Sequence, residues 1–74
     1  MGAAHGTGSF VAHTGTDVYG PGKVIGVDGV QRRVRFTRFV ATIRADDLRA
    51  ASPRERREVE AWLRARKERY GGEW

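Results

Sequence analysis

The chain has 74 residues, enough for one domain, and it has no cysteine, which excludes disulfides and cysteine-ligated zinc sites. Lysine and arginine number 14 against 9 acidic residues, for a net charge of +5, and 12 of the 14 are arginine. Because guanidinium groups pair well with phosphate and carboxylate, this balance favours nucleic acid or an acidic protein surface as the partner. A GC-rich genome also enriches arginine, so composition alone leaves the partner open.

Apolar runs in this chain are only a few residues long, whereas a membrane-spanning helix needs about 20. Nothing in the sequence resembles a signal peptide. We therefore expect a cytoplasmic protein with no membrane partner.

The N-terminal part begins with residues 1–8, which are small and nearly uncharged and predict a flexible lead-in. The run SFVAH at residues 9–13 is a candidate short strand, and the sequence leaves open whether Val11 or its neighbours face inward. Gly20-Pro21-Gly22 predicts a tight bend, in which glycine permits an unusual φ or a close backbone approach. The GPGK sequence lacks P-loop spacing, and no helix follows it.

The strongest local pattern is YGPGKVIGVDGVQRRVRF at residues 19–36, which predicts a β-hairpin. Asp28-Gly29 lies between two β-prone runs, residues 23–27 and 31–37, and suits a two-residue turn with positive φ. Gly26, inside the first run, predicts a bulge of the kind that small barrels need at their corners.

Arginine alternates with apolar residues in the second arm of this hairpin. Val34 and Phe36 share one face, whereas Arg33 and Arg35 share the other with Thr37. A slip of one residue would bury the arginines, so the register is well specified. The basic face is either a binding surface or a solvated face that blocks aggregation at the sheet edge.

A third run, residues 39–44, places Phe39, Ala41 and Ile43 on one face and Val40, Thr42 and Arg44 on the other. Residues 45–47 predict a turn or a single 3₁₀ turn that leads to a last short strand at residues 48–51. The adjacent Asp46 and Asp47 have no third ligand or catalytic partner nearby in the sequence, and we interpret them as solvated or capping residues.

Ser52-Pro53-Arg54-Glu55 predicts a helix start, with serine as the N-cap, proline at the first helical position and glutamate at N3. The helix should end near Tyr70, before a tail at residues 71–74. One stripe of this helix is largely apolar and comprises Val59, Trp62, Leu63, Arg66 and Tyr70. Trp62 either packs within the chain or, with Tyr70, contacts a protein partner.

The predicted elements form a mainly β domain, a small antiparallel barrel of about five strands at residues 9–51, followed by one C-terminal helix at residues 52–70. The expected core comprises Val11, Val24, Val27, Val34, Phe36, Ile43 and Leu48, with Val59, Trp62 and Leu63 from the helix. The sequence shows no nucleophile–base pair, carboxylate dyad or metal cluster, so we predict neither catalytic nor metal-binding residues, no cofactor and no small-molecule substrate.

The pattern FVAH at 10–13, YGPGKV at 19–24, VRF at 34–36 and Asp47-Leu48 resembles small SH3-like or Tudor-like bacterial barrels. Similar domains are the Tudor-like C-terminal domain of UvrD-type helicases and the RNA-polymerase-interacting domain of CarD-type regulators. The resemblance covers about residues 9–51 and leaves the helix unmatched. It implies an SH3-like fold and a partner in the transcription or repair machinery, either RNA polymerase or nucleic acid.

Two functions follow as hypotheses. In the first, the chain is a non-enzymatic module that contacts the backbone of DNA or RNA through Lys23, Arg33, Arg35, Arg38 and Arg44. Few aromatic residues lie beside these positions, so neither base stacking nor sequence-specific reading is expected. In the second, the chain is a protein-interaction adaptor that uses a sheet edge or the Trp62 side of the helix, or that self-associates through the helix.

Overall fold

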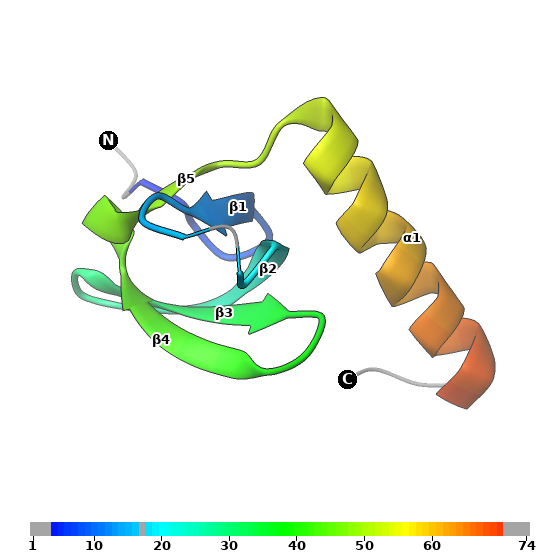
Figure 1. Cartoon of the computed structure of the whole chain (residues 1–74). Helices are drawn as coiled ribbons and strands as arrows, with labels where there is room; N and C mark the ends of the chain where they lie inside the picture. The colour runs from blue at the N-terminus through cyan, green and yellow to red at the C-terminus, as the bar shows by residue number, and fades with distance from the viewer. Residues whose placement is uncertain (1–3, 17, 71–74) are drawn as a thin grey trace.

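The computed structural model describes the backbone of residues 4–16 and 18–70 and the side chains of residues 4–16 and 18–67. Within these residues the chain forms one five-stranded antiparallel sheet followed by a single helix (Figure 1), which confirms the predicted mainly β class. The elements are β1 (Phe10–His13), β2 (Pro21–Asp28), β3 (Gln31–Phe36), β4 (Val40–Arg44), the 3₁₀ turn η1 (Ala45–Asp47), β5 (Leu48–Ala50) and α1 (Pro53–Tyr70). The strand order is β4-β3-β2-β1-β5, so β4 and β5 are the edges.

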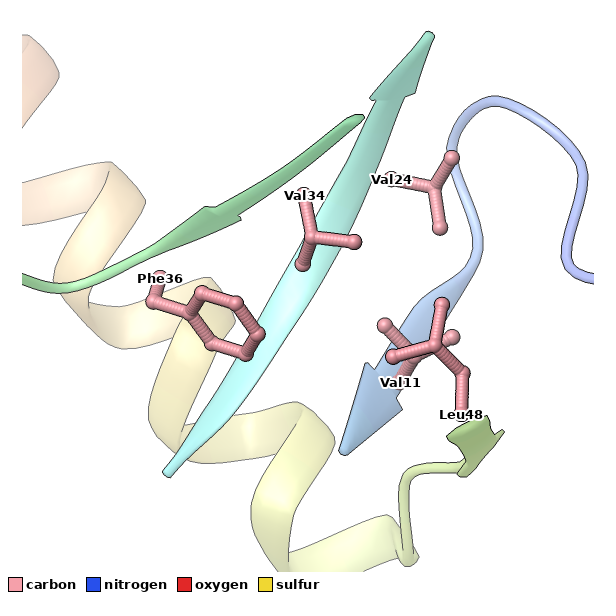
Figure 2. Close-up of a cluster of buried hydrophobic side chains, with 5 residues drawn as sticks. All are labelled: Val11, Val24, Val34, Phe36 and Leu48. Carbon is pink, nitrogen blue, oxygen red and sulfur yellow. The ribbon is translucent and has the colours of Figure 1, made fainter. Parts of the chain in front are cut away.

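The sheet curves around an apolar core to which β1, β2, β3 and β5 all contribute. Figure 2 shows the side chains of this core converging, and they are Val11, Val24, Val34, Phe36 and Leu48. Ala41 and Ile43 of β4 pack against it, as the alternation in this strand predicted, together with Tyr19. Val11 therefore faces the barrel interior, which settles the orientation that the sequence left open.

The β2–β3 hairpin turns one residue later than predicted. Asp28 pairs with Gln31, so the two turn residues are Gly29 and Val30 rather than Asp28 and Gly29. Gly29 has φ +58°, and glycine at the first central position is the requirement of a type II′ turn. Val27 was predicted to be a core residue, but it is 45% exposed, because it lies beyond the bulge, one pair away from the turn at the tip of the hairpin.

The predicted bulge is confirmed, since the β2–β3 register shifts between Val24 and Gly26. The predicted tight bend at Gly20-Pro21-Gly22 is wrong, because β2 already begins at Pro21, where proline is tolerated as the first residue of a strand. The bend ends at Gly20, which has φ +69°. Gly22 instead allows β3 to pack closely against β2. A Cβ at this position would lie 2.8 Å from the Arg35 carbonyl oxygen and 2.9 Å from the Phe36 ring.

A second apolar layer lies between α1 and the outer face of the sheet. Val59 and Ala12 are 2% and 4% exposed, yet neither belongs to the barrel core. Trp62 and Leu63 are half-buried, whereas Ala61, Arg64 and Ala65 are exposed, which confirms the predicted stripe as far as Arg66. The side chain of Tyr70 lies outside the described residues.

Residues 4–8 differ from the flexible lead-in that their composition predicted, because they are hydrogen-bonded to the barrel. The Gly8 amide donates to the Val24 carbonyl at 2.8 Å, and His5 Nε2 lies 3.1 Å from the Leu48 carbonyl oxygen. Arg32, a core-facing residue of β3 that is only 2% exposed, donates from Nε to the carbonyls of Ala4 and His5. A buried arginine thus ties this segment to the hairpin.

The start of α1 confirms the predicted capping box. The Ser52 amide donates to Glu55 Oε1 at 2.9 Å, and the Glu55 amide donates to Ser52 Oγ at 3.2 Å. Arg49 of β5 also donates to both carboxylate oxygens of Glu55, at 2.7 and 2.9 Å. The Arg49 hydrogen bond and the Ser52 amide lower the pKa of Glu55 from its usual 4.5 to about 2, because both stabilise the charged form.

Glu55→Gln should therefore lower the free energy of unfolding at pH 7 by about 1 kcal/mol, the usual effect of losing a helix cap. A depressed pKa contributes stability above about pH 4.5, and this contribution is lost as the pH falls toward 2. Urea unfolding of both proteins between pH 7 and pH 2 should show the difference shrinking toward zero. Glu58→Gln, at an exposed position on the same helix, is the control, with a change below about 0.5 kcal/mol. A pH-independent difference for Glu55→Gln would contradict this account.

Candidate nucleic-acid interface

Four of the five basic residues predicted for nucleic-acid binding project from one face of the sheet. Arg35 pairs with Lys23 on β2 and with Val40 on β4. Arg33 pairs with Thr42, and Gln31 pairs with Arg44. Because directly paired residues share a face, Lys23, Arg33, Arg35 and Arg44 all lie on the outer face, opposite the core. Arg38 is exposed in the turn between β3 and β4.

The helix divides this outer face into a covered part and an open part. Its first turns approach β1, where Arg56 Cζ lies 5.0 Å from the centroid of the Phe10 ring. Its middle approaches β3, where Arg35 Cζ lies 5.5 Å from the Trp62 ring. The helix therefore crosses the strands along the row formed by Phe10, Lys23 and Arg35. The helix leaves the rows beyond this one uncovered. We call their exposed residues the open basic face; they are Gln31, Arg33, Thr42 and Arg44.

Arg35 is not the solvated residue that the alternation of β3 suggested. It is half-buried, and its Nε is buried with no hydrogen-bond acceptor among the residues that the structure describes. Its guanidinium group lies over the Trp62 ring, and Arg66 Cζ lies 5.5 Å from the same ring. Attraction between cations and the ring stabilises this arrangement. Trp62 thus holds α1 against the sheet, which is the intrachain packing that was one of its two predicted roles.

Two aromatic rings lie beside the predicted basic residues. In the sequence, only Phe36 and Phe39 are close to these arginines. Trp62 comes from the helix, and Phe10 comes from β1, with Lys23 Nζ 5.8 Å from its ring centroid. The packing of α1 across the sheet brings Trp62 to Arg35, and the pairing of β1 with β2 brings Phe10 to Lys23. Lys23 and Arg35 thus each lie beside one aromatic ring, which agrees with the prediction of few aromatic neighbours.

A cavity of about 290 Å³ opens on the outer face where the helix does not cover it. It extends over β2, β3 and β4 and is lined by Gly26, Val27, Asp28, Gln31, Arg33 and Thr42. Of these residues, sequence reasoning proposed only Arg33 as a site residue. The pairing Asp28–Gln31–Arg44 would have indicated Asp28 and Gln31, but the turn was expected one residue too early.

Two further features lie away from this face. The rings of His13, Tyr19, Phe36 and Phe39 form a cluster of contacts with centroids 5.2 to 5.4 Å apart. A second cavity, of about 390 Å³, lies between the segment before β2 and the start of α1. It is lined by Ala12, Thr16, Gly20, Pro21, Arg54, Glu55 and Glu58.

Within the described residues, no three His, Cys, Asp or Glu side chains are grouped so that they could hold a metal ion. No helix in this part of the chain is long and apolar enough to cross a membrane. Asp46 and Asp47 are exposed in η1. The open basic face and its cavity are therefore the candidate site, because they bring exposed arginines together with a cavity. Comparison with protein-family models, characterised proteins and solved structures finds no match to this chain.

Proposed function

We propose that this chain is a non-enzymatic module that binds the phosphate backbone of nucleic acid through its open basic face. The observation that carries the proposal is the β3–β4 register, which puts Arg33 and Arg44 on the part of the sheet that α1 leaves open. In the part of the chain whose side chains are described, neither arginine forms an ion pair or a hydrogen bond, so both are available for phosphate. Arg38 lies in the adjoining turn, with Lys23 and Arg35 toward the helix.

The resemblance to SH3-like barrels that act on transcription or repair complexes agrees with this proposal and extends it. In such a setting the protein would act in the cytoplasm, with DNA or RNA held by backbone contacts. Binding that depends on phosphate contacts releases counterions, so its affinity must fall as salt rises.

Charge reversal on the open basic face should abolish most of this binding. Arg33→Glu combined with Arg44→Glu removes two phosphate contacts and adds two repulsive charges, which should weaken binding by about tenfold or more at 150 mM salt. Fluorescence anisotropy with labelled single-stranded DNA, duplex DNA and RNA would measure the change.

Arg57→Glu combined with Arg64→Glu makes the same change in net charge on exposed helix positions. This control should bind within about threefold of the unmodified protein, because only long-range attraction is reduced. Equal loss of binding in the two double variants would count against a specific role for the sheet face.

A protein-interaction adaptor is the second candidate, and it is favoured by the edge position of β4. Among the residues that the structure describes, this five-residue strand pairs with β3 alone, so its other side can accept an added strand from a partner. Recovery of one stoichiometric protein partner after nuclease treatment would support the adaptor. Loss of every partner after nuclease treatment would leave nucleic acid as the ligand.

A further inference from the structure

We infer that the cavity on the outer face binds one unpaired guanine base, which makes the protein a single-strand binder with a preference for guanine. This inference rests on the proposed function, because the open basic face must first hold the backbone. It goes beyond backbone binding by assigning a base-reading role to Asp28 and Gln31, and to Arg33 when a guanine occupies the cavity; without a guanine, Arg33 contacts phosphate as in the proposed function.

The cavity spans two neighbouring rows of paired residues on the outer face. Gly26, Arg33 and Thr42 form one row, and Asp28 and Gln31 belong to the next row with Arg44. Gly26 leaves the first row without a side chain on β2, and a Cβ built there would lie 3.7 Å from Arg33 Cβ. The bulge therefore creates a depression with a glycine floor and mixed walls, in which Val27 lies beside the polar residues. Its volume of about 290 Å³ lies just below the usual range for ligand sites, roughly 300–1,000 Å³, which suits a single base.

The walls of the cavity offer complementary hydrogen-bonding groups. The Asp28 carboxylate only accepts hydrogen bonds, the Arg33 guanidinium only donates them, and Gln31 and Thr42 do both. A carboxylate inside the cavity repels phosphate, so the phosphates must lie outside it. Arg44, which is paired with Gln31 at the margin, is placed to contact one of them.

Guanine matches this combination better than the other bases. Its O6 and N7 are adjacent acceptors that arginine binds in a bidentate manner. Its N1–H and N2–H groups are adjacent donors that fit the two oxygens of a carboxylate. Adenine, cytosine and thymine do not present two adjacent donors beside two adjacent acceptors. The donor edge of guanine is occupied in a duplex, so the base must be unpaired, as are most bases that proteins recognise specifically in RNA.

The test compares a 12-nucleotide oligo(dT) with the same strand carrying one central dG, dA or dC, by fluorescence anisotropy with the whole chain. One dG should tighten binding about tenfold, because a good bidentate contact to a base discriminates against the other bases by at least about this factor. The dA and dC strands should bind within about threefold of oligo(dT). Asp28→Asn and Gly26→Ala should each reduce the dG preference to about twofold or less, the first by removing the acceptor and the second by filling the floor.

Asp46→Asn is the matched control, because it makes the same change of charge outside the cavity. Asp46 lies in η1, close to the same hairpin, since the Ala45 amide donates to the Val30 carbonyl at the hairpin tip. It should keep the full dG preference. Salt-sensitive binding of all strands with equal affinity would overturn the guanine site and leave the backbone proposal standing. A dG preference that persists in Asp28→Asn would also overturn it. No binding to any strand would overturn both.

Discussion

Replacing Gly22 with alanine should lower the free energy of unfolding by about 2–3 kcal/mol, a large loss for a small domain. Gly22 is buried, and it lies between Val11 on β1 and Phe36 on β3. The added Cβ would lie 2.8 Å from a backbone carbonyl oxygen and 2.9 Å from both Phe36 Cδ1 and Val34 Cγ1. Neither the strand nor the packed ring can move without disturbing the core, so the clash cannot be relieved cheaply.

Gly26→Ala is the matched control for this experiment. It makes the same substitution in the same strand, but its nearest contact, Arg33 Cβ at 3.7 Å, is an ordinary van der Waals distance. Urea unfolding should therefore show a change of less than about 1 kcal/mol for Gly26→Ala. If the two variants were destabilised equally, the close packing over Gly22 would be refuted.

Replacing Arg32 with alanine should cost about 3 kcal/mol of unfolding free energy. Its Nε donates to the carbonyls of Ala4 and His5 at 3.0 and 3.1 Å, and its Nη1 donates to those of Gly29 and Gln31 at 2.6 and 2.8 Å. Truncation leaves these carbonyls without their donor and removes the link between residues 4–5 and the hairpin. Urea unfolding would give the loss, and amide hydrogen exchange should become faster at Gly8 and Ser9.

Arg33→Ala is the control, because it removes the neighbouring arginine, which is exposed on the opposite face of β3. Its effect on stability should stay within about 0.5 kcal/mol. Arg32→Lys should recover only part of the loss, since an ammonium group cannot reproduce the spread of donors along a guanidinium. Full stability in Arg32→Ala would mean that the buried arginine does not hold the N-terminal segment.

Local patterns predicted the elements of this fold well, because each depends on short-range chemistry. The alternation of Val34 and Phe36, the bulge at Gly26 and the capping box of Ser52 and Glu55 are confirmed. The same alternation also places Arg32 on the inner face with Val34. Its burial was missed because its acceptors at Ala4 and His5 lie 28 and 27 residues away, in a segment whose composition gave no sign of order.

The candidate site was harder to predict than the elements, because it depends on how the helix crosses the sheet. Periodicity placed Arg33 and Arg35 on one face, but it could not show that Trp62 covers Arg35 and leaves Arg33 open. The cavity depends on the exact hairpin register, and a shift of one residue in the expected turn concealed the pairing of Asp28 with Gln31. Tertiary packing therefore decided which basic residues are accessible.

The most direct measurement is a ¹H–¹⁵N NMR titration of the protein with a short single-stranded oligonucleotide that contains one dG. The account predicts amide shift changes concentrated at residues 26–33 and 42–44, the strands and hairpin that carry the open basic face and the cavity. The segment at residues 14–16 and the exposed side of α1 should change little. Shift changes confined to α1 or to the β4 edge alone, or no changes at near-physiological salt, would contradict the assignment of function to the sheet face.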